Sequence, residues 1–425
     1  MRNRFTMSMA LLASCISVAA QTRPAEVLYD EAKVPKYTLP DPLTLQSGEK
    51  VKDAHTWTSK RRPEILSMYQ DEVFGHSPAA PAKLEYEVVS VDKQALAGKA
   101  VRKLVTLSLA GKKVNMLLYL PAGAKKSSPV FVALGFNGNQ TVAVDPGVPL
   151  AEEWNVDPAT KKLVHKTAAD SSRGASAERW QVEKILAHGY GLATIYAGDI
   201  EPDVPGAISY GIRPLFFKPG QTMPLANDWG AIAAWAWGLS RAMDYLEKDR
   251  DVDAKRVAVF GHSRMGKTAL WAGAQDTRFS LVISNESGEG GAAISRRDFG
   301  ERTKDLNTRF PHWFASNFSK YNDREAAMPF DSHMLLALIA PRALYVASAE
   351  GDQWSDPRGE FLGLVNAGPV FELLGRKGLA TDKMPAVHQP IVHDVAYHIR
   401  AGKHDVTAYD WDQYLKFADS QWQAK

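Results

Sequence analysis

Cysteine is almost absent from this chain of 425 residues, which contains only Cys15. A single cysteine cannot form an intramolecular disulfide, so a small secreted scaffold held together by cross-links is excluded. A cysteine nucleophile in the folded part is excluded too, because Cys15 falls within the first twenty residues. The chain is 45% hydrophobic, an ordinary share for a globular protein that folds around an apolar core.

An excess of charge is also lacking. The 51 Lys and Arg residues against 48 Asp and Glu residues leave a formal net charge of +3. So small a balance, without a basic block interleaved with aromatic residues, argues against nucleic acid or an anionic membrane as a partner. No run after residue 20 reaches the roughly 18 apolar residues that a membrane helix needs. We therefore expect neither a nucleic-acid partner nor a transmembrane segment.

Residues 1–20 have the pattern of a secretory signal peptide. Arg2 and Arg4 precede an apolar run, and the small residues 18–20 resemble a cleavage site. Residues 12–15, Leu-Ala-Ser-Cys, also fit the lipid-attachment site of a bacterial lipoprotein, with the lipid on Cys15. We expect a secreted or periplasmic protein whose remaining residues, 21–425, form a single catalytic domain.

The hydrophobic pattern predicts the order of the elements. Proline-rich residues 21–55 suggest an extended arm, 61–75 a helix, and the alternating segments 83–92 and 101–123 antiparallel strands. Short, continuously apolar runs follow, each typical of a strand buried on both faces: 129–136, 190–198, 256–261, 281–287 and 343–352.

Helical segments separate these apolar runs. In 228–248, for example, apolar residues recur every three to four positions. Strands that alternate with helices predict an α/β fold, a three-layer αβα sandwich with a mostly parallel central sheet. Residues 137–180 show no clear periodicity, and we expect them to be a long insertion within the domain.

The segment "KRVAVFGHSRMGKTALWAGAQD" (255–276) places Ser263 between a buried strand and a helix beginning near Met265. Gly261 and Gly266 allow a sharp turn there, as in the nucleophile elbow of α/β-hydrolases. The usual G-x-S-x-G pattern would have glycine at 265, so the fit is incomplete, and a helix-capping role for the serine is the alternative. The same tripeptide, Gly-His-Ser, ends at Ser77, but prolines follow it and a helix cannot start there.

A nucleophilic serine needs a base and a residue that orients the base, in the chain order Ser, acid, His for this fold. His404, in a loop after Gly402, is the candidate base, whereas His398 lies on an apolar, strand-like run and is expected in the core. Glu286 ends the predicted strand 281–286, one strand after the serine, and Asp352 lies in the loop that follows the strand 343–349. Either carboxylate could accept the imidazole N–H, and the spacing does not distinguish them.

Arg264 directly follows the candidate nucleophile. Its backbone N–H and its guanidinium could both reach the oxyanion that forms during ester hydrolysis. A solvated, structural arginine is the alternative interpretation.

Five segments together resemble the glucuronoyl esterases, the fifteenth carbohydrate esterase family, in their bacterial form. The resemblance spans roughly residues 55 to 420. It is carried by "GHSRMGK" (261–267), "NESGEGGAAISRRDFGE" (285–301), "PHWF" (311–314), "DSHMLLALIAPRALYVASAEGDQWSDPRGE" (331–360) and "YHIRAGKHD" (397–405). The cysteines that cross-link fungal members are missing from this chain.

This resemblance implies cleavage of the ester between 4-O-methyl-glucuronic acid of glucuronoxylan and an alcohol of lignin. It implies that Ser263 is the nucleophile, His404 the base and Arg264 the oxyanion-stabilising residue. Glu286 matches the family's acid, and Asp352 matches the acid that some bacterial members use instead, so this choice stays open.

The resemblance also implies a sugar-binding group: Lys267 and Glu301 for the uronate hydroxyls and Trp354 for the face of the ring. Sugars offer hydroxyls to charged partners and an apolar face to an aromatic, which agrees with these residue types. No cofactor or metal is implied, and we expect a monomer.

Other functions remain open at this point. An acetyl-xylan esterase, another carbohydrate esterase or a serine peptidase could use the same fold, and a non-catalytic glycan-binding protein could retain it. A zinc hydrolase is disfavoured because the motif H-E-x-x-H is missing and the histidines are scattered.

Overall fold

The computed structural model describes residues 27–422. The expected signal peptide and Cys15 lie outside the described residues. Within the described part of the chain, no helix combines the length and the apolar character needed to cross a bilayer.

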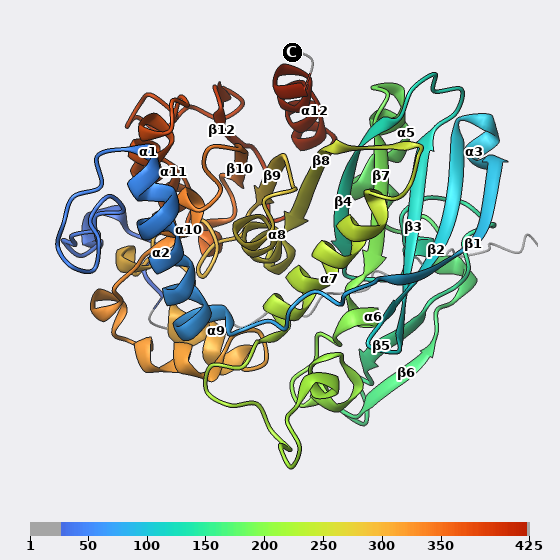
Figure 1. Ribbon diagram of the computed structural model, residues 1–425, viewed down its shortest axis with the longest axis horizontal. Coiled ribbons are helices and arrows are strands. Elements are labelled where there is room, and N and C mark those ends of the chain that lie inside the picture. Colours follow the sequence, from blue (N-terminus) through green and yellow to red (C-terminus); the bar gives the residue numbers. More distant parts are fainter. Residues whose placement is uncertain (1–26, 423–425) are drawn as a thin grey trace, which may run out of the picture.

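A ten-stranded sheet runs through the molecule (Figure 1). Its strands have the spatial order β1-β2-β3-β7-β4-β8-β9-β10-β12-β11. The pairs from β7 through β12 are parallel, and antiparallel pairs occur at both ends. The bounds are β1 Glu85–Gln94, β2 Ala100–Leu109, β3 Lys112–Pro121, β4 Ser128–Gly135, β7 Gly191–Tyr196, β8 Val252–His262, β9 Leu281–Asn285, β10 Ala343–Ala349, β11 Ile391–Val392 and β12 Val395–Arg400.

Helices cover both faces of this sheet, and a separate apolar core lies between the sheet and the helices on each face. One core includes buried side chains of α7 (Ala231–Leu246), α8 (Arg264–Gln275), α10 (Ser332–Ala337) and α11 (Pro357–Leu373). The other includes α5 (Val182–Ala187) and α12 (Ala408–Trp422). The strands between the cores are apolar on both faces because both faces are buried. The predicted α/β-hydrolase-type sandwich with a mostly parallel sheet is confirmed.

The remaining helices are short: α1 Ala54–Thr56, α2 Arg62–Tyr69, α3 Ala95–Gly98, α4 Ala177–Trp180, α6 Ala197–Ile200 and α9 Thr303–Arg309. The helix expected over 61–75 is therefore α-helical only in its middle. Turns of π-helix, Trp57–Arg61 and Gln70–Phe74, flank that middle part.

The insertion at 137–180 is more regular than its sequence suggests. It contains a separate hairpin, β5 (Glu152–Val156) and β6 (Leu163–Thr167). Both strands are only five residues long and mostly exposed, and they carry few apolar residues, so their hydrophobic pattern is weak. Cross-strand stacking of Trp154 on His165, with ring centroids 4.0 Å apart, packs one face of the hairpin.

Candidate active site

Ser263 occupies the turn from β8 into α8, at the carboxyl edge of the parallel strands. Its backbone has φ 58° and ψ −128°, a strained conformation for a residue other than glycine. The turn is so tight that a Cβ on Gly261 would lie 1.8 Å from the carbonyl oxygen of Met265. The Ser263 N–H donates to the Asn285 carbonyl of neighbouring β9 at 2.9 Å. These features are those of a nucleophile elbow.

His404 lies in the loop between β12 and α12, at the same edge of the sheet. Its ring centroid is 4.4 Å from that of His262, the residue just before Ser263. Its side chain is 39% exposed, so the ring borders solvent at the site. No hydrogen bond joins Ser263 Oγ to His404 within residues 27–422, and such contacts are often long before substrate binds.

Two buried carboxylates approach the same nitrogen of His404. Asp352 Oδ2 lies 2.6 Å from Nδ1, and Glu286 Oε2 lies 3.1 Å from it. Glu286 has further partners, because its Oε1 accepts from Arg400 Nη2 at 2.6 Å and its Oε2 from the Asp405 N–H at 3.0 Å. Asp352 therefore makes the shorter contact with His404, and Glu286 also anchors the loop that carries His404.

The two acids differ in their titration. Burial raises the pKa of Glu286 to about 7, although His404 and Arg400 act against this. Burial also acts to raise the pKa of Asp352, but the hydrogen bond and charge of His404 outweigh it and lower this pKa. For His404, desolvation acts to lower the pKa, and the bonds to Asp352 and Glu286 overcome it and raise the pKa above its ordinary value. Asp352 is therefore the more firmly ionised partner.

Arg264 begins α8 and turns its guanidinium onto a loop that the sequence did not single out. Its Nε forms an ion pair with Oδ2 of Asp203, a residue that follows α6. Its Cζ lies 4.3 Å above the ring centroid of Phe136, which follows β4, and 5.7 Å from that of Trp313. Phe136 ends a predicted strand and could have been noticed for that reason, whereas Asp203 had no local signal.

The three predicted sugar-binding residues lie together beside the turn. Lys267, one helical turn after Ser263, donates from Nζ to the Ser287 carbonyl and lies 3.7 Å from Glu301 Oε2. The Glu301 N–H donates to the Trp354 carbonyl at 2.8 Å. The indole of Trp354 faces Arg309, whose Cζ is 5.3 Å from the ring centroid.

The Lys267–Glu301 pair is almost fully buried, with side chains 4% and 8% exposed. Burial lowers the pKa of Lys267 and raises that of Glu301, while each partner's charge opposes the shift of the other.

We expect Lys267→Met to destabilise the fold by about 3 kcal/mol, because it leaves buried Glu301 without its cation. The double variant with Glu301→Gln should recover part of this loss in urea unfolding. A single variant as stable as the parent would contradict the pairing.

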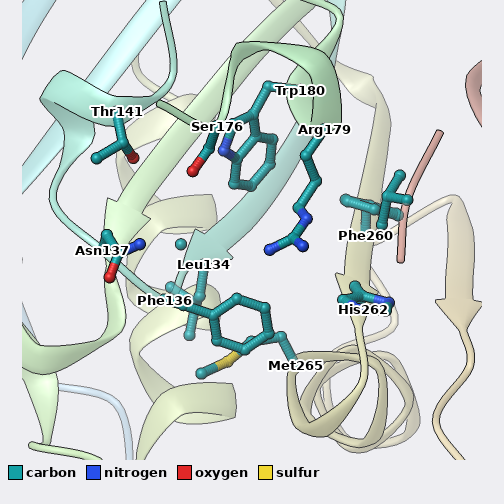
Figure 2. A pocket seen from close by; sticks show the side chains of 12 residues that line it. Leu134, Phe136, Asn137, Thr141, Ser176, Arg179, Trp180, Phe260, His262 and Met265 are labelled. Carbon is teal, nitrogen blue, oxygen red and sulfur yellow. The ribbon is translucent and has the colours of Figure 1, made fainter. Parts of the chain in front are cut away.

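Figure 2 shows a pocket beside His262 and Met265, lined also by residues at the ends of β4 and β8 and by Ser176, Arg179 and Trp180. Its free volume is about 20 Å³, room for about one water molecule. Arg179 lies above His262 in this view and pairs with Asp405 at 2.6 Å. The last residues of the insertion thus pack against the His404 loop. The sequence did not predict this contact.

One group of residues could in principle hold a metal ion. His262, Glu286 and His404 each offer a ligand atom, and these atoms lie within 4.8 Å of one another. Several of their polar atoms have protein partners, since His262 Nδ1 bonds Asn285 at 2.6 Å, His404 Nδ1 bonds Asp352 at 2.6 Å and Glu286 pairs with Arg400. The arrangement fits a hydrogen-bonded network.

His398, the other histidine considered as a base, is fully buried. Its Nε2 bonds Asp410 at 2.9 Å and its Nδ1 bonds the Tyr345 hydroxyl at 2.8 Å. The expectation of a core role for His398 is confirmed.

Comparison with known proteins identifies the family. Residues 223–375 match the family model "Glucuronyl esterase, fungi". The structure is similar to a glucuronoyl esterase from Solibacter usitatus, with 66% identity, a TM-score of 0.88 and coverage of 92% of this chain and 100% of that one. It is also similar to a promiscuous CE15 esterase from the marine bacterial metagenome, with 48% identity, a TM-score of 0.86 and coverage of 93% and 100%.

A fungal relative extends the comparison. The 4-O-methyl-glucuronoyl methylesterase 1 of Phanerochaete chrysosporium is 28% identical over 79% of this chain and 62% of its own length. Together with the bacterial structures, this relationship confirms the resemblance seen in the sequence. The chain belongs to the glucuronoyl esterases of carbohydrate esterase family 15, and it is a carboxylic ester hydrolase.

Proposed function

We propose that this glucuronoyl esterase cleaves the ester between 4-O-methyl-glucuronic acid of glucuronoxylan and an alcohol of lignin, through an acyl-enzyme on Ser263. The Phanerochaete relative, named as a 4-O-methyl-glucuronoyl methylesterase, supports the acid part of this substrate. A secreted or periplasmic location, expected from residues 1–20, would suit a polysaccharide substrate.

In the proposed mechanism, His404 takes the proton of Ser263 Oγ as that oxygen bonds to the ester carbonyl carbon. The tetrahedral intermediate then collapses, and the alcohol leaves with the proton from the imidazolium. Water next attacks the acyl-enzyme, again with His404 as base, and releases the uronate and the free serine. Asp352, 2.6 Å from Nδ1, holds the ring in the required tautomer and stabilises its charged form.

Arg264 and the sugar-binding group would act on the acyl side of the substrate. The guanidinium of Arg264 would stabilise the negative charge on the former carbonyl oxygen, where a fixed donor contributes most. Lys267 and Glu301 would bind hydroxyls of the uronate, and Trp354 would cover the face of its ring. The closeness of these three residues to one another supports a single sugar site beside Ser263.

The observation that carries the proposal is the strained Ser263 beside a histidine that is itself held by a buried carboxylate. A benzyl ester of glucuronic acid and an acetylated glucose, offered to the same enzyme preparation, test the substrate. We expect the glucuronate ester to have the higher kcat/KM. Preference for the acetate would instead favour the acetyl-xylan esterase alternative.

We expect Asp352→Asn to lower kcat by about 100-fold, at the lower end of what a general base contributes, because Glu286 can still accept from His404. Loss of the Asp352 charge also removes stabilisation of the imidazolium, so the pKa of His404 falls. The acidic limb of the pH–kcat/KM profile should therefore move to lower pH, by about one unit. Steady-state kinetics between pH 5 and 11 measure both effects, because the bonds to Asp352 and Glu286 raise the pKa of His404 to about 10 in the parent.

Glu286→Gln is the matched variant. We expect it to lower kcat by less than about 10-fold, since Asp352 remains at Nδ1. It should cost more stability than Asp352→Asn, because it leaves Arg400 buried with one fewer anionic partner. Equal, mild losses of activity in the two variants would mean that the carboxylates share the role, and a larger loss in Glu286→Gln would reverse the assignment.

A further inference from the structure

Asp203 contacts three side chains from segments that are distant in the sequence, one through an ion pair and two through hydrogen bonds. Its Oδ2 pairs with Arg264 Nε at the start of α8. Its Oδ1 accepts from His312 Nε2 at 2.9 Å and from Trp313 Nε1 at 2.7 Å, in the loop after α9. One carboxylate thus ties together the residue next to Ser263 and two aromatic side chains.

The contact leaves the end of the Arg264 side chain free. Its nearest atom to Asp203 is Nε, and none of its three guanidinium nitrogens donates a hydrogen bond to a described residue. The ring of Phe136, 4.3 Å from Cζ, lies against the guanidinium. A carboxylate at Nε and a ring beneath the group together restrict both its direction and its plane. The side chain remains 29% exposed, so the free fork is open to a ligand.

Asp203 meets its neighbours through both carboxylate oxygens. His312 and Trp313 donate to Oδ1, and the nearest atom of Arg264 lies against Oδ2. Burial acts to raise the pKa of Asp203, but the charge of Arg264 and the bond from His312 outweigh it and lower this pKa. Asp203 is therefore ionised wherever the enzyme works near neutral pH.

We propose that Asp203 is a positioning residue for the esterase reaction, which together with Phe136 aims the guanidinium fork of Arg264 at the carbonyl oxygen of the bound ester. This inference rests on the proposed role of Arg264. Preorganised donors stabilise a transition state because they need no rearrangement as charge develops. A misplacement of about 1 Å can cost about 100-fold in rate, so a residue that only aims another one can have a large effect.

Asp203→Asn tests this directly. The amide can keep an oxygen for His312 and Trp313, but its neutral NH₂ group would replace the oxygen that pairs with Arg264, so the ion pair is lost. We expect kcat on a benzyl glucuronate ester to fall about 10- to 100-fold with KM changed less than about threefold. Asp253→Asn is the matched control, because Asp253 pairs with Arg256 at 2.7 Å and is 23% exposed, like Asp203. We expect it to retain parental kcat.

A double-mutant cycle separates positioning from a general structural role. In an Arg264→Ala background, Asp203→Asn should change kcat by less than about twofold, because the residue through which Asp203 acts is gone. An equal loss in both backgrounds, or parental kcat in the single variant, would overturn the inference. If Arg264→Ala itself were fully active, the proposed function of Arg264 would fail instead, so the two failures are distinguishable.

A second variant keeps the test informative if Asp203→Asn does not fold. Phe136→Leu removes the ring beneath the guanidinium, and we expect kcat to fall about threefold or more in the parent and to stay unchanged in the Arg264→Ala background.

The ¹⁵N–¹H resonance of Arg264 Nε gives an independent readout. It should be sharp and protected from exchange in the parent, and a broad, rapidly exchanging signal there would contradict a fixed side chain.

Discussion

Ser263→Ala is expected to lower kcat on glucuronate esters by about 10⁴-fold or more, the loss seen when a serine nucleophile is removed from a triad. The remaining groups, His404 and Arg264, could still bind and polarise the ester, but no oxygen would be placed to form the acyl-enzyme. The substituted side chain differs by one hydroxyl that makes no hydrogen bond within the described residues, and the backbone at φ 58° is equally strained for alanine. We therefore expect a change in unfolding free energy of less than about 0.5 kcal/mol.

Ser77→Ala is the control that the chain itself offers. Ser77 ends the other Gly-His-Ser tripeptide, at 75–77, but it lies outside any strand–helix turn. The activity of the Ser77→Ala variant should therefore equal that of the parent. Mass spectrometry after brief exposure to a slowly deacylating glucuronate ester should find the acyl group on the peptide that contains Ser263. Acylation elsewhere, or turnover by Ser263→Ala within tenfold of the parent, would contradict the proposed nucleophile.

Arg264→Ala is expected to reduce kcat by about 10²- to 10³-fold, which corresponds to about 3–4 kcal/mol of transition-state stabilisation from one oxyanion donor. KM should change little, because the charge that the guanidinium meets develops only in the transition state. Arg264→Lys should recover only part of the loss, since an ammonium cannot reproduce the planar fork or its stacking on Phe136.

Arg256→Ala is the matched control for this substitution. Arg256 pairs with Asp253 through Nε at 2.7 Å, and its side chain is 35% exposed, close to the 29% of Arg264. It lies within β8, seven residues before Ser263, so its removal tests the cost of losing such a pair away from the chemistry. A rise in KM with unchanged kcat in Arg264→Ala would mean that the arginine binds the substrate and does not stabilise the oxyanion.

The order of elements and the location of the turn were predictable because they depend on neighbouring residues. Continuous apolar runs indicated β4, β7, β8, β9 and β10, and each of them is present. The glycines around Ser263 indicated a sharp turn, and the positive φ of Ser263 agrees with it. The hairpin in the segment 137–180 was missed because its strands are only five residues long and carry few apolar residues.

The surroundings of the reacting groups were less predictable. Spacing left Asp352 and Glu286 equivalent, since each simply follows a strand. Their roles differ through a contact of 2.6 Å against one of 3.1 Å, and through Arg400, which bonds Glu286 and not Asp352. Asp203 and Phe136 had no motif of their own, and they matter only because folding brings them to Arg264.

Local pattern was therefore enough to specify a hydrolase sandwich, a serine on its elbow and a late histidine, since hydrophobic period and turn chemistry are properties of consecutive residues. Tertiary packing alone decided which carboxylate lies nearer to His404 and which side chains contact Arg264. The two carboxylate distances differ by only a few tenths of an ångström, and electrostatic energies between such close side chains are set by the packed environment and not by position along the chain.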